Sequence, residues 1–170
     1  MSPVAPPRIV LRPAQRADVP LILAFVRELA EYERLADAVV ADAARFEAAL
    51  FGARPDAEVV IAEVDGEAAG FALFFHNFST FLGRRGLYLE DLYVRPAHRG
   101  HGVGKHLMTH LAALAVERGC GRFEWSVLDW NAPAIGFYRA IGAVGQDGWT
   151  VQRLDGDALR ALAADARVPR

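Results

Sequence analysis

Apolar and polar positions along the chain follow two spacings, one typical of strands and one typical of helices. Runs of alternating or continuous apolar residues predict strands at 8–12, 58–64, 67–76, 87–95, 123–128 and 149–154. Apolar residues spaced three and four apart predict helices at 18–32, 42–50, 105–118, 131–142 and 157–166. The pair Asp65-Gly66 between two of the strands predicts a β-hairpin, and residues 78–86 are expected to form a loop.

This order of elements predicts a mixed α/β protein. The strand at 87–95, the helix at 105–118 and the strand at 123–128 form a crossover unit, which favours parallel pairing of the two strands. The strands at 58–64 and 67–76 are joined by the hairpin turn and should be antiparallel neighbours. We therefore expect a central mixed sheet of about six to seven strands flanked by helices, in one domain over residues 1–170. Residues 1–7 contain three prolines and are expected to be flexible.

The stretch from Leu87 to Gly104 combines a strand, a glycine-rich turn and the start of a helix. Three alternating glycines, Gly100, Gly102 and Gly104, allow positive φ angles and leave no Cβ to hold a ligand away from the backbone amides. The first N–H groups of a helix lack intrahelical partners and attract anions, phosphate in particular. The pattern predicts a phosphate-binding turn, although a tight strand-to-helix connection is the simpler alternative.

Two familiar phosphate-binding loops do not fit this turn. A Walker loop requires glycine at the position of Arg99 and serine or threonine at the position of His106. A dinucleotide-binding fingerprint requires glycine at the position of Lys105. The surrounding basic or potentially basic side chains still favour a ligand with several phosphate charges, and they are Arg95, His98, Arg99, His101 and Lys105.

Several residues could carry acid–base chemistry. Glu90 and Asp91 are adjacent on a strand, so their side chains should face opposite sides unless a β-bulge intervenes. One could be a general base, or both could be ordinary polar carboxylates. Tyr138 could be a general acid or a core residue beside Phe137, and Asn131 is most simply a helix N-cap.

Taken together, these motifs resemble the GNAT superfamily of N-acetyltransferases. The segment Arg99 to Gly104 is similar to the Arg/Gln-x-x-Gly-x-Gly/Ala pyrophosphate loop of that family. The segments 87–94 and 130–143 are similar to the diamine branch, whose members act on spermidine, spermine or thialysine. The resemblance implies acetyl-CoA as cosubstrate and a GNAT-like fold.

The resemblance also implies a role for each matching residue. The backbone of Leu92 and Val94 would pair with the pantetheine arm, and Asn131 would hydrogen-bond the cofactor. The pyrophosphate would lie on Arg99, Gly100, His101, Gly102, Val103, Gly104 and Lys105. Tyr138 would contact the thioester sulfur as general acid, and Glu90 would take the ammonium proton through water. The amine would be bound by Tyr32, Glu33, Asp91 and Trp149.

The predicted function is therefore direct transfer of acetyl from acetyl-CoA to a primary amine of a polyamine, diamine or lysine analogue. Two alternatives are acetylation of protein lysines or N-termini, and a non-catalytic acyl-CoA-binding sensor. A net charge of −2 with dispersed basic residues argues against a nucleic-acid partner.

Other features of the sequence bear on localisation, metal binding and oligomeric state. Long uncharged apolar runs are absent from the sequence, and Cys120 is the single cysteine, so we expect a soluble, cytoplasmic protein. His106 and His110 lack the glutamate of a zinc-protease motif, so no metal is expected. The apolar stretch at 142–151 and the family resemblance predict a homodimer.

Overall fold

The computed structural model describes residues 6–166, which form two compact units divided between Ser126 and Val127. Residues 1–5, most of the segment expected to be flexible, lie outside the described part. The strands of the first unit are β1 (Ile9–Pro13), β2 (Glu58–Val64), β3 (Glu67–Ser79), β4 (Arg84–Val94) and β5 (Phe123–Trp125). Its helices are η1 (Arg16–Asp18), α1 (Val19–Tyr32), η2 (Ala36–Ala38), α2 (Ala43–Phe51), η3 (Pro96–His98) and α3 (Val103–Glu117). The second unit contains α4 (Ala132–Ala140) and α5 (Gly156–Ala164). The expectation of one domain over 1–170 stays a prediction.

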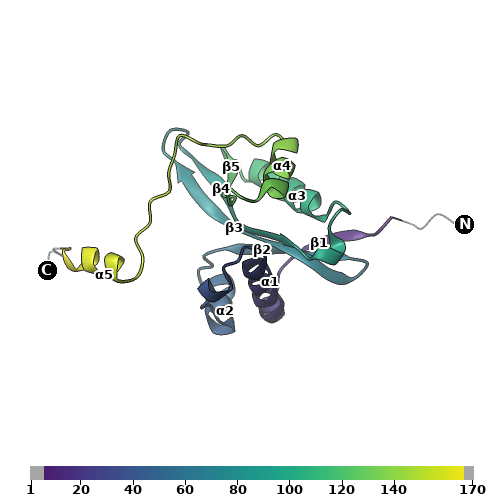
Figure 1. Ribbon diagram of the computed structural model, residues 1–170, viewed down its shortest axis with the longest axis horizontal. Coiled ribbons are helices and arrows are strands. Elements are labelled where there is room, and N and C mark those ends of the chain that lie inside the picture. Colours follow the sequence, from purple (N-terminus) through teal and green to yellow (C-terminus); the bar gives the residue numbers. More distant parts are fainter. Residues whose placement is uncertain (1–5, 167–170) are drawn as a thin grey trace, which may run out of the picture. The chain divides into compact units, whose positions relative to one another are not determined.

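The first unit is built on a five-stranded mixed sheet in the order β1-β2-β3-β4-β5. The first four strands are antiparallel, and β5 pairs with β4 in parallel, as the crossover through α3 predicts. Helices α1 and α2 cover one face and α3 covers the other (Figure 1). The hairpin between β2 and β3 is confirmed, and Asp65 and Gly66 both have positive φ at its turn. The mixed α/β fold class is therefore confirmed.

The structure corrects three sequence predictions. The described residues form five strands rather than six to seven, because 149–154 forms no strand. The strand expected at 123–128 ends at Trp125. The expected loop at 78–86 is largely strand, since β3 extends to Ser79 and β4 begins at Arg84 around a turn at Gly83. Alternation marks a residue run that can form a strand, but a hydrogen-bonding neighbour decides whether it does.

The core on the α1 side of the sheet contains the apolar stripe that the sequence predicts. Phe25 of α1 is fully buried and stacks on Phe71 of β3, with ring centroids 5.3 Å apart. Tyr93 of β4 lies 6.3 Å from the Phe25 ring at a tilted angle. These contacts anchor α1 over β3 and over β4, the strand that contains the predicted active-site carboxylates.

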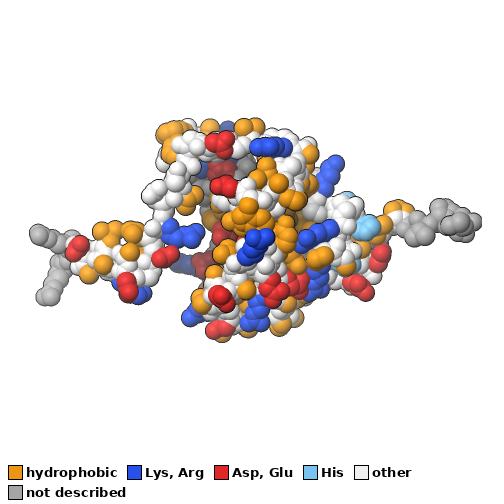
Figure 2. All heavy atoms as spheres, viewed as in Figure 1, with side chains coloured by type: hydrophobic (Ala, Val, Ile, Leu, Met, Phe, Trp, Pro, Cys, Tyr) orange, Lys and Arg blue, Asp and Glu red, His pale blue; other side chains and the backbone are white. Residues whose placement is uncertain are grey.

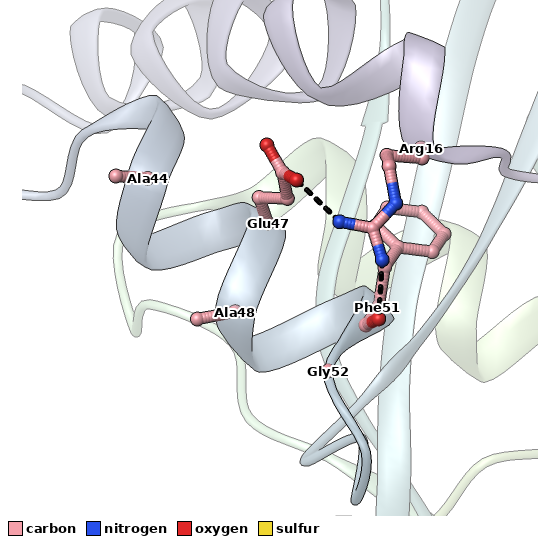
Figure 3. Close-up of a pocket in the computed structure, with 6 residues that line it drawn as sticks. All are labelled: Arg16, Ala44, Glu47, Ala48, Phe51 and Gly52. Carbon is pink, nitrogen blue, oxygen red and sulfur yellow. Dashed lines mark hydrogen bonds and ion pairs between the residues drawn. The ribbon is translucent and has the colours of Figure 1, made fainter.

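Helix α2 is held at the edge of this layer by Arg16 of η1. Its guanidinium pairs with Glu47 and donates a 2.7 Å hydrogen bond to the Phe51 carbonyl, beside a shallow hollow lined also by Ala44, Ala48 and Gly52 (Figure 3). None of the predicted site residues lines this hollow. It serves as a packing junction between two surface elements.

Charged side chains of both signs are interspersed on the viewed face of the molecule, without a stripe of one sign (Figure 2). Among the described residues, no helix combines the length and the apolar character needed to cross a membrane.

Candidate functional site

A β-bulge interrupts β4 at the adjacent carboxylates. Leu89 pairs with Phe74 and Asp91 pairs with Leu73, so Glu90 is the extra residue on β4. A bulge ends the strict alternation of faces and re-aims the residues around it. The expectation that Glu90 and Asp91 face opposite sides of a regular strand therefore does not apply.

The pairing of β5 with β4 ends at the same point, just before the bulge. In the described part of the chain, β5 pairs with Leu87, Tyr88 and Leu89, and its last strand residue is Trp125. From Glu90 onward, no strand of residues 6–166 pairs with the β5-facing edge of β4. Leu92 and Val94, the predicted pantetheine contacts, belong to this stretch.

The glycine turn follows β4 through η3 and leads into α3. Gly100 has φ of 81° and Gly102 has φ of 85°, whereas Gly104 already belongs to the helix. Apart from Gly100 itself and its two chain neighbours, no atom that the structure describes lies within 4 Å of the position a Cβ on Gly100 would take. The helix begins at Val103, with Gly102 as an N-cap that has no side chain. The turn thus presents open backbone and first-turn amides, the features that an anionic ligand uses.

Arg99 opens this turn and contacts three other residues. Its Nε donates a 2.8 Å hydrogen bond to the Val94 carbonyl. Its guanidinium carbon lies 5.0 Å from the ring centroid of Tyr32 and 5.7 Å from that of Tyr93. The side chain is thereby linked both to the end of α1 and to the end of β4.

Arg95 has a structural role that the sequence does not reveal. It was expected among the basic groups around a phosphate, but its Nη2 lies 2.8 Å from Glu28 of α1 and its Nη1 donates to the Ala68 carbonyl. Its guanidinium carbon also lies 4.7 Å from the Phe25 ring centroid. Hydrogen bonding from Arg95 holds the pKa of Glu28 below its usual range. Arg95 therefore fastens α1 to the sheet.

Three carboxylates on β4 and at the end of α1 form an acidic group, which we name the carboxylate cluster: Glu33, Glu90 and Asp91. Burial, followed by the negative charges of Glu90 and Glu33, raises the pKa of Asp91 to about 6. Burial also raises the pKa of Glu33, whereas the Glu90 side chain is exposed. The cluster carries excess negative charge in a partly desolvated place, which a bound cation would relieve.

Replacing Asp91 by asparagine tests this electrostatic assignment. The pKa of Asp91 is higher in the folded protein than in the unfolded chain. Ionisation of Asp91 therefore lowers the free energy of unfolding as pH rises from 4 to about 6. The free energy of unfolding of Asp91→Asn should therefore exceed that of wild type by an amount that grows over this range and then levels. Urea denaturation at pH 4, 5, 6 and 7 measures it. Asp56→Asn, at an exposed position, is the control, and an equal gain in both variants would contradict the assignment.

The other predicted site residues lie in the second unit. The Asn131 side chain accepts a 3.3 Å hydrogen bond from the Ala134 amide, which confirms its N-cap role in α4. Tyr138 lies in the same helix, with its ring centroid 5.4 Å from that of Phe137. The amide of Trp149 donates to the Gln146 carbonyl across a turn that follows α4. Their predicted roles toward the cofactor and the amine stay predictions.

His106 and His110 are exposed on α3, and the His106 Nδ1 lies 2.9 Å from the Gly102 carbonyl. In the residues that the structure describes, no group of three or more His, Cys, Asp or Glu side chains could hold a metal ion. Cys120 is half-buried just beyond the end of α3.

Known proteins are similar to this chain in sequence. Residues 23–143 match the Acetyltransferase (GNAT) family. Thialysine N-epsilon-acetyltransferase from Sus scrofa is 37% identical over 166 residues, which cover 91% of this chain and 97% of that protein. L-ornithine N5-acetyltransferase NATA1 from Arabidopsis thaliana is 34% identical, covering 89% of this chain and 86% of the relative.

An integron cassette protein from the mobile metagenome of V. cholerae has a similar structure. Its TM-score is 0.77 at 26% identity, and the match covers 91% of this chain and 97% of the other. The bulge in β4, the early end of β5 and the glycine turn thus occur in a chain whose sequence matches one family over most of its length. The chain belongs to the GNAT acetyltransferase family.

Proposed function

We propose that the protein transfers acetyl from acetyl-CoA to a primary amine of a small cationic substrate: a polyamine, a diamine or a lysine analogue. The carboxylate cluster is the observation that carries this substrate class. Glu33, Glu90 and Asp91 combine negative charge with partial burial next to the bulge of β4. Such a place favours an ammonium group over a neutral or anionic acceptor. The thialysine and ornithine acetyltransferases named above support the same class.

The residues of the glycine turn fit the pyrophosphate of acetyl-CoA. Positive φ at Gly100 and Gly102 turns the chain so that first-turn amides of α3 are presented without an intervening side chain. Arg99 and Lys105 add positive charge at the start and the end of the turn. We assign Gly100, His101, Gly102, Val103 and Gly104 to the backbone contacts, and the edge of β4 at Leu92 and Val94 to the pantetheine arm.

The acetyl-CoA thioester supplies the acyl group. An amine attacks a thioester only as the free base, and most amines are protonated at neutral pH. Glu90, exposed at the bulge, takes the ammonium proton, directly or through water. The negative charges of Asp91 and Glu33 attract the remaining cationic part of the substrate. Tyr32, the last residue of α1, precedes Glu33 directly and is assigned to the same amine pocket.

We assign the second unit a complementary part in the reaction. Tyr138 donates a proton to the leaving thiolate of coenzyme A, Asn131 hydrogen-bonds the cofactor, and Trp149 contacts the amine. The motif match across 130–143 supports these roles. Transfer of the acyl group is direct, so Cys120 has no nucleophilic role.

A thiol-release assay tests the function. Purified protein, acetyl-CoA and a panel of diamines, polyamines, thialysine, lysine and ornithine should give amine-dependent release of coenzyme A. Mass spectrometry should show a gain of one acetyl group on the amine. Release with a peptide lysine but with no small amine would favour the protein acetyltransferase alternative. Acetyl-CoA binding by calorimetry without turnover on any acceptor would favour the sensor alternative.

We also propose a cytoplasmic homodimer that acts without a metal, nucleic acid or membrane partner. Exposed apolar side chains in the second unit support the dimer, because apolar patches on a protein surface often mark interfaces. They are Val144, Trp149, Val151, Leu154, Leu159 and Leu162. A single cysteine is consistent with a reducing compartment.

A further inference from the structure

Tyr32 has contacts that its assignment to the amine pocket does not explain. It is the last residue of α1, and its ring centroid lies 5.0 Å from the guanidinium carbon of Arg99. Arg99 opens the glycine turn, more than sixty positions later in the sequence. The end of α1 and the start of the cofactor turn are therefore joined by a cation–π contact.

The contact is one part of a clamp on the arginine, which we name the Arg99 clamp: Tyr32, Tyr93 and the carbonyl of Val94. Tyr93 lies 5.7 Å from the guanidinium carbon, and the Val94 oxygen accepts from Nε at 2.8 Å. Nε donates to the backbone of β4, while the guanidinium carbon lies over two aromatic rings. A guanidinium held this way retains its Nη donors for an anion and loses less side-chain freedom when the anion binds.

We propose that Tyr32 is a positioning residue for the cofactor: its ring holds Arg99 in the orientation that receives the pyrophosphate of coenzyme A. This inference rests on the proposed function for the identity of the anion. It gives Tyr32 a role in cofactor affinity that depends on its ring and not on its hydroxyl. Because Glu33 follows Tyr32 directly, the same helix end carries both a cofactor-positioning group and a carboxylate of the cluster.

The test is a calorimetric titration with coenzyme A alone, which needs no knowledge of the amine. Tyr32→Leu should weaken coenzyme A binding by about two- to tenfold, because the released Arg99 side chain must then be ordered when the anion binds. Tyr32→Phe should bind within about twofold of wild type, because the ring stays. Tyr32→Gln is a second ring-less variant, and thermal denaturation establishes that each variant is folded. Leu35→Ala truncates a half-exposed apolar side chain three positions further along the chain and should leave affinity unchanged.

A double-mutant cycle separates an effect through Arg99 from any other effect. In an Arg99→Gln background, Tyr32→Leu should cause no further loss of coenzyme A affinity. The inference is overturned if Tyr32→Leu and Tyr32→Gln bind as wild type does, if Tyr32→Phe loses as much as Tyr32→Leu, or if the loss persists without Arg99. Failure of the wild-type protein to bind coenzyme A would instead refute the proposed function.

Discussion

Replacing Tyr138 by phenylalanine should lower kcat by about 10²-fold or more, if this tyrosine protonates the leaving thiolate. The substitution removes one oxygen atom and keeps the ring that contacts Phe137, so α4 should keep its packing. A general acid acts in the transition state and contributes little to binding of the ground state. The KM for acetyl-CoA should therefore change by less than about threefold. Steady-state kinetics with the most active amine of the panel measures both parameters.

Tyr88→Phe provides the matched control. Its hydroxyl lies 2.9 Å from the Ser126 hydroxyl in the first unit, so removing it costs one surface hydrogen bond and no proposed catalytic group. We expect kcat of this variant to stay within about threefold of wild type. An unchanged kcat in Tyr138→Phe would remove Tyr138 from the mechanism.

Replacing Phe25 by alanine should lower the free energy of unfolding by about 3–5 kcal/mol, the range for emptying a buried phenylalanine site. Phe25 is fully buried, stacks on Phe71, and lies beneath the guanidinium of Arg95. The change leaves a cavity between α1 and the sheet and removes the aromatic face below Arg95. Urea denaturation followed by circular dichroism measures the loss, which is a large share of the stability of a typical domain.

Phe81→Ala makes the same chemical change at a residue that is 94% exposed, in the turn between β3 and β4. Its effect should stay within about 0.5 kcal/mol. A loss below about 1 kcal/mol in Phe25→Ala would show that the α1 layer is not anchored as the structure indicates.

Local patterns in the sequence predicted most elements of the first unit. The apolar stripe of α1, the Asp65-Gly66 hairpin and the strand–glycine turn–helix stretch all appear, because each depends on residues close together in the chain. The strand predicted at 149–154 was wrong because a strand also requires a neighbour to pair with, which alternation does not specify. Residues 80–83 form a short turn where a longer loop was expected, since pairing of β3 with β4 continues almost to the tip of the hairpin.

In the candidate site, too, some features could be predicted from nearby residues and others depend on contacts between distant ones. Gly100 and Gly102 could be read from the sequence, since positive φ and an open turn follow from the residue type. Glu90 and Asp91 could be named as acid–base candidates, but only pairing with β3 placed the bulge between Leu89 and Asp91. The raised pKa of Asp91 likewise depends on burial and on Glu33, which is more than fifty residues away in the chain.

The glycine turn and the helix after it were determined by the sequence itself, because backbone conformation and helix start depend on neighbouring residues. The tertiary structure alone decided the partners of the two arginines that flank the turn. The motif includes Arg99 and not Arg95, but only the structure shows that Glu28 pairs with Arg95 while Tyr32 and Tyr93 contact Arg99. Charge and aromatic contacts act across space, so their partners are set only when α1 packs against β4.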